Sequence, residues 1–209
     1  MATWTGRQFT ALGITQHPVG PHLETLQRRF GGVAMLMIDV SGSMDGTPIL
    51  NAAEGAQTFV QEAVAAHYKV GVMLWNTRVI ALAEPTTDGT SALTILSTLN
   101  RASGGNALDG PLKECHRVLT PFSGDRVVAL FGDGDLTPKF QVLALVSMMK
   151  ADNIRFITRG LGALATSEFA EISDEAPEAV RIESVDQLAS GIASMASTLK
   201  SSGIVERGR

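Results

Sequence analysis

The fold of this chain is decided by residues 35–48, which read MLMIDVSGSMDGTP. An apolar run from Met35 to Ile38 ends abruptly at Asp39, and two hydroxyl side chains, Ser41 and Ser43, follow at alternate positions. A continuous apolar run of this kind predicts a strand that is covered on both faces of a sheet. The carboxylate and the two hydroxyls therefore come at the end of a buried strand, where the chain turns toward a helix.

The rest of the chain alternates predicted strands with predicted helices. This alternation predicts an α/β fold, with a doubly wound, mostly parallel, Rossmann-like central sheet and helices on both faces. The connection at 76–78 is too short for a helical crossover, so we expect one short antiparallel edge strand. We expect Thr47 to cap the first long helix. The expected strands are 33–38, 70–75, 79–82, 127–131, 154–158 and 180–182, and the expected helices are 47–67, 91–100, 107–119, 140–151, 168–172 and 185–199.

Two of these strands end in carboxylates. Asp39 ends the first strand, and Asp133 follows the strand 127–131. In open α/β sheets ligands bind beyond the carboxyl ends of the strands, so we expect the two carboxylates to share one site. Ser41 and Ser43 add hydroxyl oxygens, and Gly42 permits a tight turn between them.

Oxygen ligands of this mixture suit Mg²⁺ or Mn²⁺ better than zinc, which prefers nitrogen and sulfur. The four histidines have no ligand spacing, and Cys115 is the one cysteine. An isolated Asp-x-Ser after a strand is more often a turn or a helix cap. Here the run is Asp-x-Ser-x-Ser, and Gly132-Asp133-Gly134 follows a second buried strand, which favours a cation site.

The sequence resembles the von Willebrand factor type A domain family over roughly 33–199. The segment 39-DVSGSM-44 matches the metal-ion-dependent adhesion site motif of that family, D-x-S-x-S. Three further segments resemble family segments in the expected order: 104-GGNALDGPL-112, 129-ALFGDGDLTP-138 and 154-IRFITRGLG-162.

The resemblance implies a set of metal ligands and a function. Carried over residue by residue, the ligands are Asp39, Ser41, Ser43, Asn106 and Asp133. Asn106 stands where the family has threonine, which is a departure, although an amide oxygen can also coordinate a hard cation. The family metal is rarely catalytic and holds an acidic side chain of a partner. The resemblance therefore implies a non-enzymatic protein-interaction module.

The resemblance implies a member of the bacterial, intracellular type of this family. Partners of this type include separate ring-forming ATPases and multi-protein complexes, so an ATPase or a complex is one expectation for the partner here. Two alternatives stay open. One is a Mg²⁺-dependent phosphatase of the haloacid-dehalogenase type, in which Asp39 would be the nucleophile, although Ser41 replaces the usual general acid. The other is a domain that keeps the fold but binds no metal.

Composition and charge disfavour several classes of function. The chain has 209 residues and a net charge of −4, and the segment 33–199 has 11 Lys and Arg against 19 Asp and Glu. Such an acidic body disfavours nucleic acid, whose phosphates need clustered cations. No stretch is apolar enough to predict a membrane span or a secretory signal, and we expect a cytoplasmic protein. We expect an N-terminal extension at 1–32, the domain at 33–199 and a flexible tail at 200–209.

Overall fold

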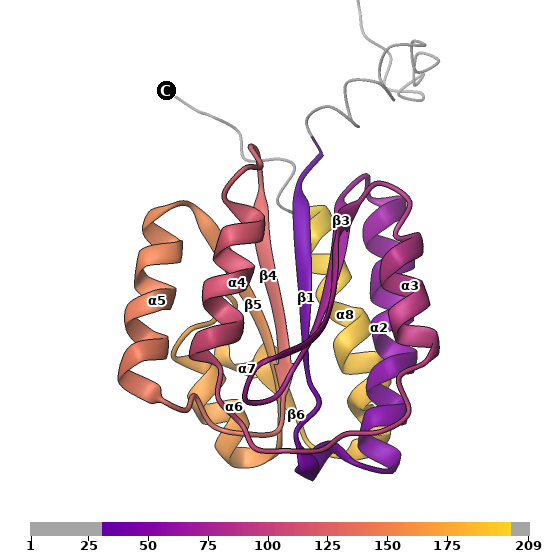
Figure 1. The fold of residues 1–209 in the computed structure, drawn as a ribbon, viewed down its shortest axis with the longest axis vertical. Helices are drawn as coiled ribbons and strands as arrows, with labels where there is room; N and C mark the ends of the chain where they lie inside the picture. Colours follow the sequence, from indigo (N-terminus) through magenta and orange to yellow (C-terminus); the bar gives the residue numbers. More distant parts are fainter. Residues whose placement is uncertain (1–30, 202–209) are drawn as a thin grey trace, which may run out of the picture.

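The computed structural model describes residues 31–201, with the side chains of 31–199, and it contains a six-stranded sheet between two layers of helices (Figure 1). The sheet has the strand order β3-β2-β1-β4-β5-β6. The strands are β1 (Val33–Asp39), β2 (Lys69–Trp75), β3 (Val79–Thr86), β4 (Arg126–Gly132), β5 (Ile154–Leu161) and β6 (Arg181–Ile182). The α-helices are α2 (Thr47–Ala65), α3 (Thr90–Ser97), α4 (Asp109–Leu119), α5 (Lys139–Ala151), α6 (Gly162–Ala170), α7 (Pro177–Val180) and α8 (Leu188–Ser201), with short 3-10 helices η1 (Gly42–Met44) and η2 (Val185–Gln187).

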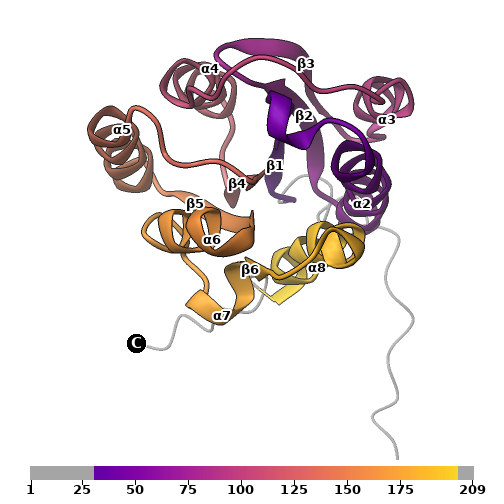
Figure 2. The same ribbon diagram turned by 90° about the horizontal axis from the view of Figure 1, so that it is seen from below.

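The strand β1 lies at the centre of the sheet because both of its faces are apolar. Every residue from Val33 to Asp39 is buried. Since successive side chains of a strand point to opposite faces, Leu36 and Ile38 pack with α2, α3 and α8, whereas Met35 and Met37 pack with α4 and α5. One core lies on each face of the sheet, and Figure 2 shows the two helix layers end-on.

The predicted fold class is confirmed. The strands β2, β1, β4, β5 and β6 are parallel, and β3 pairs with β2 in the antiparallel direction after the short turn at 76–78. From β1 the chain first crosses to β2 and later returns to the other side of β1 to form β4. The strand order therefore reverses between β1 and β4, which is where doubly wound sheets bind ligands.

Several local predictions are wrong in instructive ways. Thr47 does not cap α2, because Gly46 occupies the N-cap position with a left-handed φ of 84° and no side-chain bond. The helix predicted at 168–172 begins earlier, at Gly162, and packs so closely on β5 that a Cβ at Gly160 would collide with the backbone of Ala165 and Thr166. The strand β3 continues to Thr86 through Pro85, which an edge strand can accommodate.

Two further expectations concern membrane-spanning helices and the two ends of the chain. No helix of the described residues is both long and apolar enough to cross a membrane. Residues 1–30 and 202–209 lie outside the described residues, so the N-terminal extension and the C-terminal tail stay predictions.

Candidate metal centre

The five predicted ligand residues lie at the carboxyl edge of the sheet, around the point where the strand order reverses. Asp39 is the last residue of β1, and Ser41 and Ser43 lie in the turn that includes η1. Asp133 directly follows β4, the neighbour of β1, and Asn106 lies in the loop between α3 and α4. Figure 2 is seen from this edge, with β1 and β4 near the centre and helices around them.

A chain of hydrogen bonds links four of these residues. The Ser41 backbone N–H donates to Asp39 Oδ1 at 2.7 Å, and the Ser41 and Ser43 Oγ atoms lie 3.2 Å apart. The Ser43 hydroxyl then donates to Asp133 Oδ1 at 2.8 Å. The structure therefore brings the carboxylates of two adjacent strands together through the two serines.

The loop Gly132-Asp133-Gly134 brings in the remaining residue. A Cβ at Gly132 would lie 3.1 Å from Asp39 Oδ2, and a Cβ at Gly134 would collide with Asn106 Nδ2. Both glycines thus let a predicted ligand side chain lie directly against the loop backbone. Asp133, between them, bonds to Ser43, so three successive residues of one loop contact three different members of the site.

Two oxygen atoms of the site are buried without a hydrogen-bond partner. Within the described side chains, only four buried polar side-chain atoms are unpartnered, and two of these are Asp39 Oδ2 and Asn106 Oδ1. Buried polar atoms are nearly always paired, because an unpaired one costs free energy. Both atoms are hard oxygen donors at the expected position, so the residues present fit Mg²⁺ or Mn²⁺.

The donor set is not built from carboxylates alone. In residues 31–199 no group of three or more His, Cys, Asp and Glu side chains gathers in a way that could hold a metal. A cation at this edge would therefore be held by Asp39 and Asp133 together with the serine hydroxyls and the Asn106 amide oxygen, with water to complete the coordination.

The environment of Asp39 disfavours its negative charge. Burial raises the pKa of this carboxyl to about 6, the hydrogen bonds from Ser41 lower it in part, and the charge of Asp133 raises it again. A cation beside the carboxylate would act in the opposite direction, because an opposite charge favours the ionised form.

Asn76 is a supporting residue of the candidate site that the sequence reasoning missed. It follows β2 at the same edge and is only 9% exposed. Its Nδ2 donates to the Ser103 carbonyl at 2.8 Å, and its own carbonyl accepts from the Ala107 N–H at 3.1 Å. These bonds hold the loop that carries Asn106. A polar residue at the carboxyl end of a buried strand was the signal that could have revealed it.

The geometry gives little support to the phosphatase alternative. Asp39 is fully buried, whereas a nucleophile must reach its substrate. Lys139, at the start of α5, could offer a cation to a phosphate at this edge, but it forms ion pairs with Glu168 and Glu171 at 3.0 and 2.6 Å. Asp135 lies two residues after Asp133; its carboxylate accepts a bond from the Thr137 hydroxyl, and its backbone carbonyl accepts from Asn106 Nδ2 at 3.1 Å.

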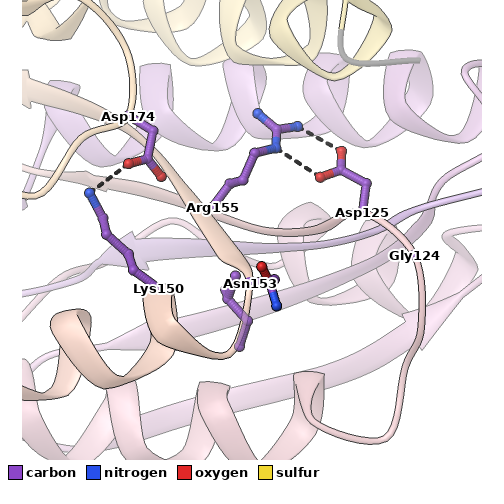
Figure 3. A pocket seen from close by; sticks show the side chains of 7 residues that line it. Gly124, Asp125, Lys150, Asn153, Arg155 and Asp174 are labelled. Carbon is purple, nitrogen blue, oxygen red and sulfur yellow. Dashed lines mark hydrogen bonds and ion pairs between the residues drawn. The ribbon is translucent and has the colours of Figure 1, made fainter. Parts of the chain in front are cut away.

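A pocket lies at the opposite edge of the sheet. This pocket of about 700 Å³ is located where β4 and β5 begin (Figure 3). Its charged side chains bind one another, since Arg155 pairs with Asp125 at 2.6 Å and Lys150 pairs with Asp174 at 2.6 Å. Its charges are already satisfied within the fold, so the carboxyl edge remains the better candidate site.

Comparisons with known proteins agree with this architecture. Residues 34–135 match the family model of the von Willebrand factor type A domain. No curated protein sequence matches the chain. Similar solved structures include a von Willebrand factor type A protein from Catenulispora acidiphila, at 21% identity and a TM-score of 0.66, covering 81% of this chain and 42% of that one.

In two further comparisons, the match with this chain extends over nearly the whole of the solved chain. The von Willebrand factor domain of the pilus tip protein Mfa5 from Porphyromonas gingivalis has 12% identity and a TM-score of 0.71, covering 86% of this chain and 98% of that one. BatB from Bacteroides thetaiotaomicron has 16% identity and a TM-score of 0.62, covering 82% and 100%. At these identities the likeness establishes a shared fold. The chain spans less than half of the Catenulispora protein, so the activity of that whole protein does not transfer.

Proposed function

Because residues 34–135 belong to the von Willebrand factor type A family, a family of protein-interaction modules, we propose that this domain binds a protein partner through a divalent cation. The cation is Mg²⁺ or Mn²⁺, and it holds a Glu or Asp side chain of the partner. In this proposal the ion binds and does not react, so the domain is not an enzyme.

The charged and the neutral ligands of the site would have different roles. Asp39 and Asp133 supply two negative charges, which can at most balance a divalent ion. Ser41, Ser43 and Asn106 supply neutral oxygens, which coordinate without reducing the charge further. The ion would keep a coordination position for a third carboxylate, because these side chains leave part of its shell to exchangeable water.

The observation that carries this proposal is the pair of unpartnered buried oxygens, Asp39 Oδ2 and Asn106 Oδ1. They come from residues that are 67 positions apart in the sequence, and the Asp39 and Asn106 side chains both lie against the segment 132–134. Buried oxygens are seldom left unpaired, and a hard cation at this edge of the sheet would satisfy oxygen donors of this kind.

Calorimetric titration of Mg²⁺ into the metal-free full chain tests the proposal. The informative variant is Asp133→Ala, and the matched control is Asp135→Ala, which removes a carboxylate two residues away in the same loop. We expect saturable binding in the wild type and in the control, and none in Asp133→Ala. Absence of binding in the wild type would favour a domain that keeps the fold but uses no metal.

The partner and the compartment are also part of the proposal. We propose a separate protein partner, such as an ATPase or a component of a multi-protein complex, and a cytoplasmic location. Affinity capture from a lysate with Mg²⁺ and with EDTA would test the partner, because a partner held through the ion is lost with EDTA. Cell fractionation would test the location.

A further inference from the structure

The exposed large apolar side chains of this domain gather at the edge that carries the candidate metal centre. Five such side chains are exposed within residues 31–199. Four of them lie near the carboxyl edge of the sheet, at the beginning of an element that starts there: Leu50 of α2, Ile80 of β3, Phe140 of α5 and Leu164 of α6. The fifth, Met148, lies in the last turn of α5, toward the opposite edge.

Phe140 and Leu164 are the most exposed, at 83% and 61%, and the fold places them on neighbouring helices. Lys139, which precedes Phe140, reaches across to Glu168 of α6 at 3.0 Å. Leu164 lies four residues before Glu168, so it is on the same face of α6 and one turn nearer the carboxyl edge. We call these two side chains the apolar pair. Both residues belong to helices that adjoin the loop 133–138, which carries Asp133: α5 follows this loop, and the Leu136 N–H donates to Glu168 Oε2 of α6 at 3.3 Å.

Two arginines lie on the other side of the site. Arg78 is in the turn between β2 and β3, and Arg101 is in the loop between α3 and α4, and both are exposed. A Cβ at Gly105 would lie 3.2 Å from the Thr77 side chain, so this turn and this loop are in contact. No ion pair involves either arginine among the residues that the structure describes. Their positive charges remain available to a partner.

The order of the strands in the sheet determines the order in which these residues lie along its carboxyl edge. Arg78 follows β2, the candidate ligands follow β1 and β4, and Leu164 follows β5, and these strands are neighbours in that order. Neighbouring strands are about 4.8 Å apart, so the β5 exit lies about 7 Å from the midpoint between β1 and β4. An extended peptide advances about 3.3 Å per residue and would cover this distance in about two residues.

We propose that the partner presents a short extended segment in which a large apolar residue stands two or three positions from the acidic residue that meets the cation. The apolar residue packs on the apolar pair, Phe140 and Leu164. Acidic residues on the other side of the metal-binding residue face Arg78 and Arg101. This inference rests on the proposed function and adds to it the chemistry of the partner.

Selection of random short peptides displayed on phage, on the immobilised full chain with Mg²⁺, tests the inference. The same selection is run with EDTA and on the double variant Phe140→Ser/Leu164→Ser. The matched control is Met148→Ser, which removes an exposed apolar side chain of the same helix at the other edge. Affinities of selected peptides are then measured on all four proteins, with Asp133→Ala as the fourth.

The expected result in Mg²⁺ is enrichment of Asp or Glu with a large apolar residue two or three positions away. The double variant should bind the selected peptides at least roughly tenfold more weakly, as the loss of one buried apolar contact implies, and Met148→Ser should bind as the wild type. Acidic enrichment without an apolar preference, or equal binding by the double variant, would overturn this inference and leave the proposed function standing. Enrichment that is the same in EDTA and in Asp133→Ala would overturn both.

Discussion

Asn106 and Gly134 are so close that a Cβ added to Gly134 would collide with the Asn106 amide nitrogen. The contact matters because Asn106 occupies the position at which the sequence departs from the metal-site motif of the family that it resembles. The same amide nitrogen donates to the Asp135 carbonyl at 3.1 Å, which leaves the amide oxygen buried and unpartnered. The loop after β4 therefore fixes which end of the asparagine is available to a cation.

Gly134→Ala should weaken Mg²⁺ binding without unfolding the domain. The new methyl group has to displace the Asn106 side chain, which is the end of a flexible group, so the backbone can stay in place. Misplacing one ligand should lower the affinity by roughly tenfold to a hundredfold, as the loss of a supporting residue does in other metal sites. Calorimetry measures the affinity, and circular dichroism measures the fold.

The matched control for this substitution is Gly110→Ala in α4. A Cβ at Gly110 meets nothing within 4 Å, and alanine is the better helix residue. We expect unchanged Mg²⁺ affinity and equal or slightly higher stability. Equal Mg²⁺ affinity in Gly134→Ala and the wild type would show that Asn106 does not take part in the site.

Substitutions at Asn106 itself test what its amide oxygen contributes to ion binding, apart from its amide nitrogen. Asn106→Ala removes both the amide oxygen and the bond to the Asp135 carbonyl, and should weaken Mg²⁺ binding. Asn106→Thr keeps a side-chain oxygen that can coordinate the ion, and should retain more affinity than alanine. The affinities of the two variants are compared by titration. Alanine binding Mg²⁺ as tightly as the wild type would exclude Asn106 from the ligand set.

The pH dependence of stability tests the burial of Asp39. In the metal-free chain its pKa is about 6, compared with 3.8 when unfolded, because burial disfavours the charge. Between these pH values the folded chain holds the proton more tightly than the unfolded chain, so stability falls as the pH rises. The fall should be about 3 kcal/mol in total and complete a little above pH 6, at about 1.4 kcal/mol per pH unit between the two pKa values.

Urea unfolding at several pH values, after removal of metal, measures this fall. Asn at position 39 has a similar shape and no charge, so Asp39→Asn should lose this part of the pH dependence. Stability of the wild type that is flat or rises between pH 4 and pH 6, relative to Asp39→Asn, would contradict the account that burial disfavours the charge of Asp39.

Much of the fold could be predicted from the sequence because its determinants are local. The apolar run from Met35 to Ile38 predicts a central strand, and the polar residues after it predict the carboxyl edge. The first residues of the helices were harder to predict. Gly46 caps α2 where Thr47 was expected, and α6 begins at Gly162 because close packing on β5 overrides the weak local helical signal.

The candidate site could be predicted only in part. The motif indicates Asp39, Ser41 and Ser43, and the strand order adds Asp133. The hydrogen bonds among these residues depend on the pairing of β1 with β4. The place of Asn76 at the end of a buried strand was a usable signal, but its hydrogen bonds and the unpartnered oxygen of Asn106 could not be predicted, because both depend on how the loop between α3 and α4 folds over the end of β2.

Asn76→Ala should destabilise the domain and also weaken its binding of Mg²⁺. The change breaks the part-buried bond from Nδ2 to the Ser103 carbonyl, which costs about 0.5–1.5 kcal/mol. The loop that carries Asn106 then becomes less well ordered. The control Asn51→Ala also removes a side-chain bond, to the Val185 carbonyl, but it touches none of the candidate ligands. Equal losses of Mg²⁺ affinity in the two variants would argue against a positioning role for Asn76.

The central claim is that these oxygens hold one divalent ion, and Mn²⁺ titration followed by electron paramagnetic resonance tests it most directly. Free Mn²⁺ has a strong signal that is lost on binding, so the titration counts bound ions. The account predicts one saturable site in the full chain and no such site in the double variant Ser43→Ala/Asp133→Ala, with the fold of both unchanged. A wild-type chain that leaves all Mn²⁺ free, or a double variant that still binds one ion, would contradict it.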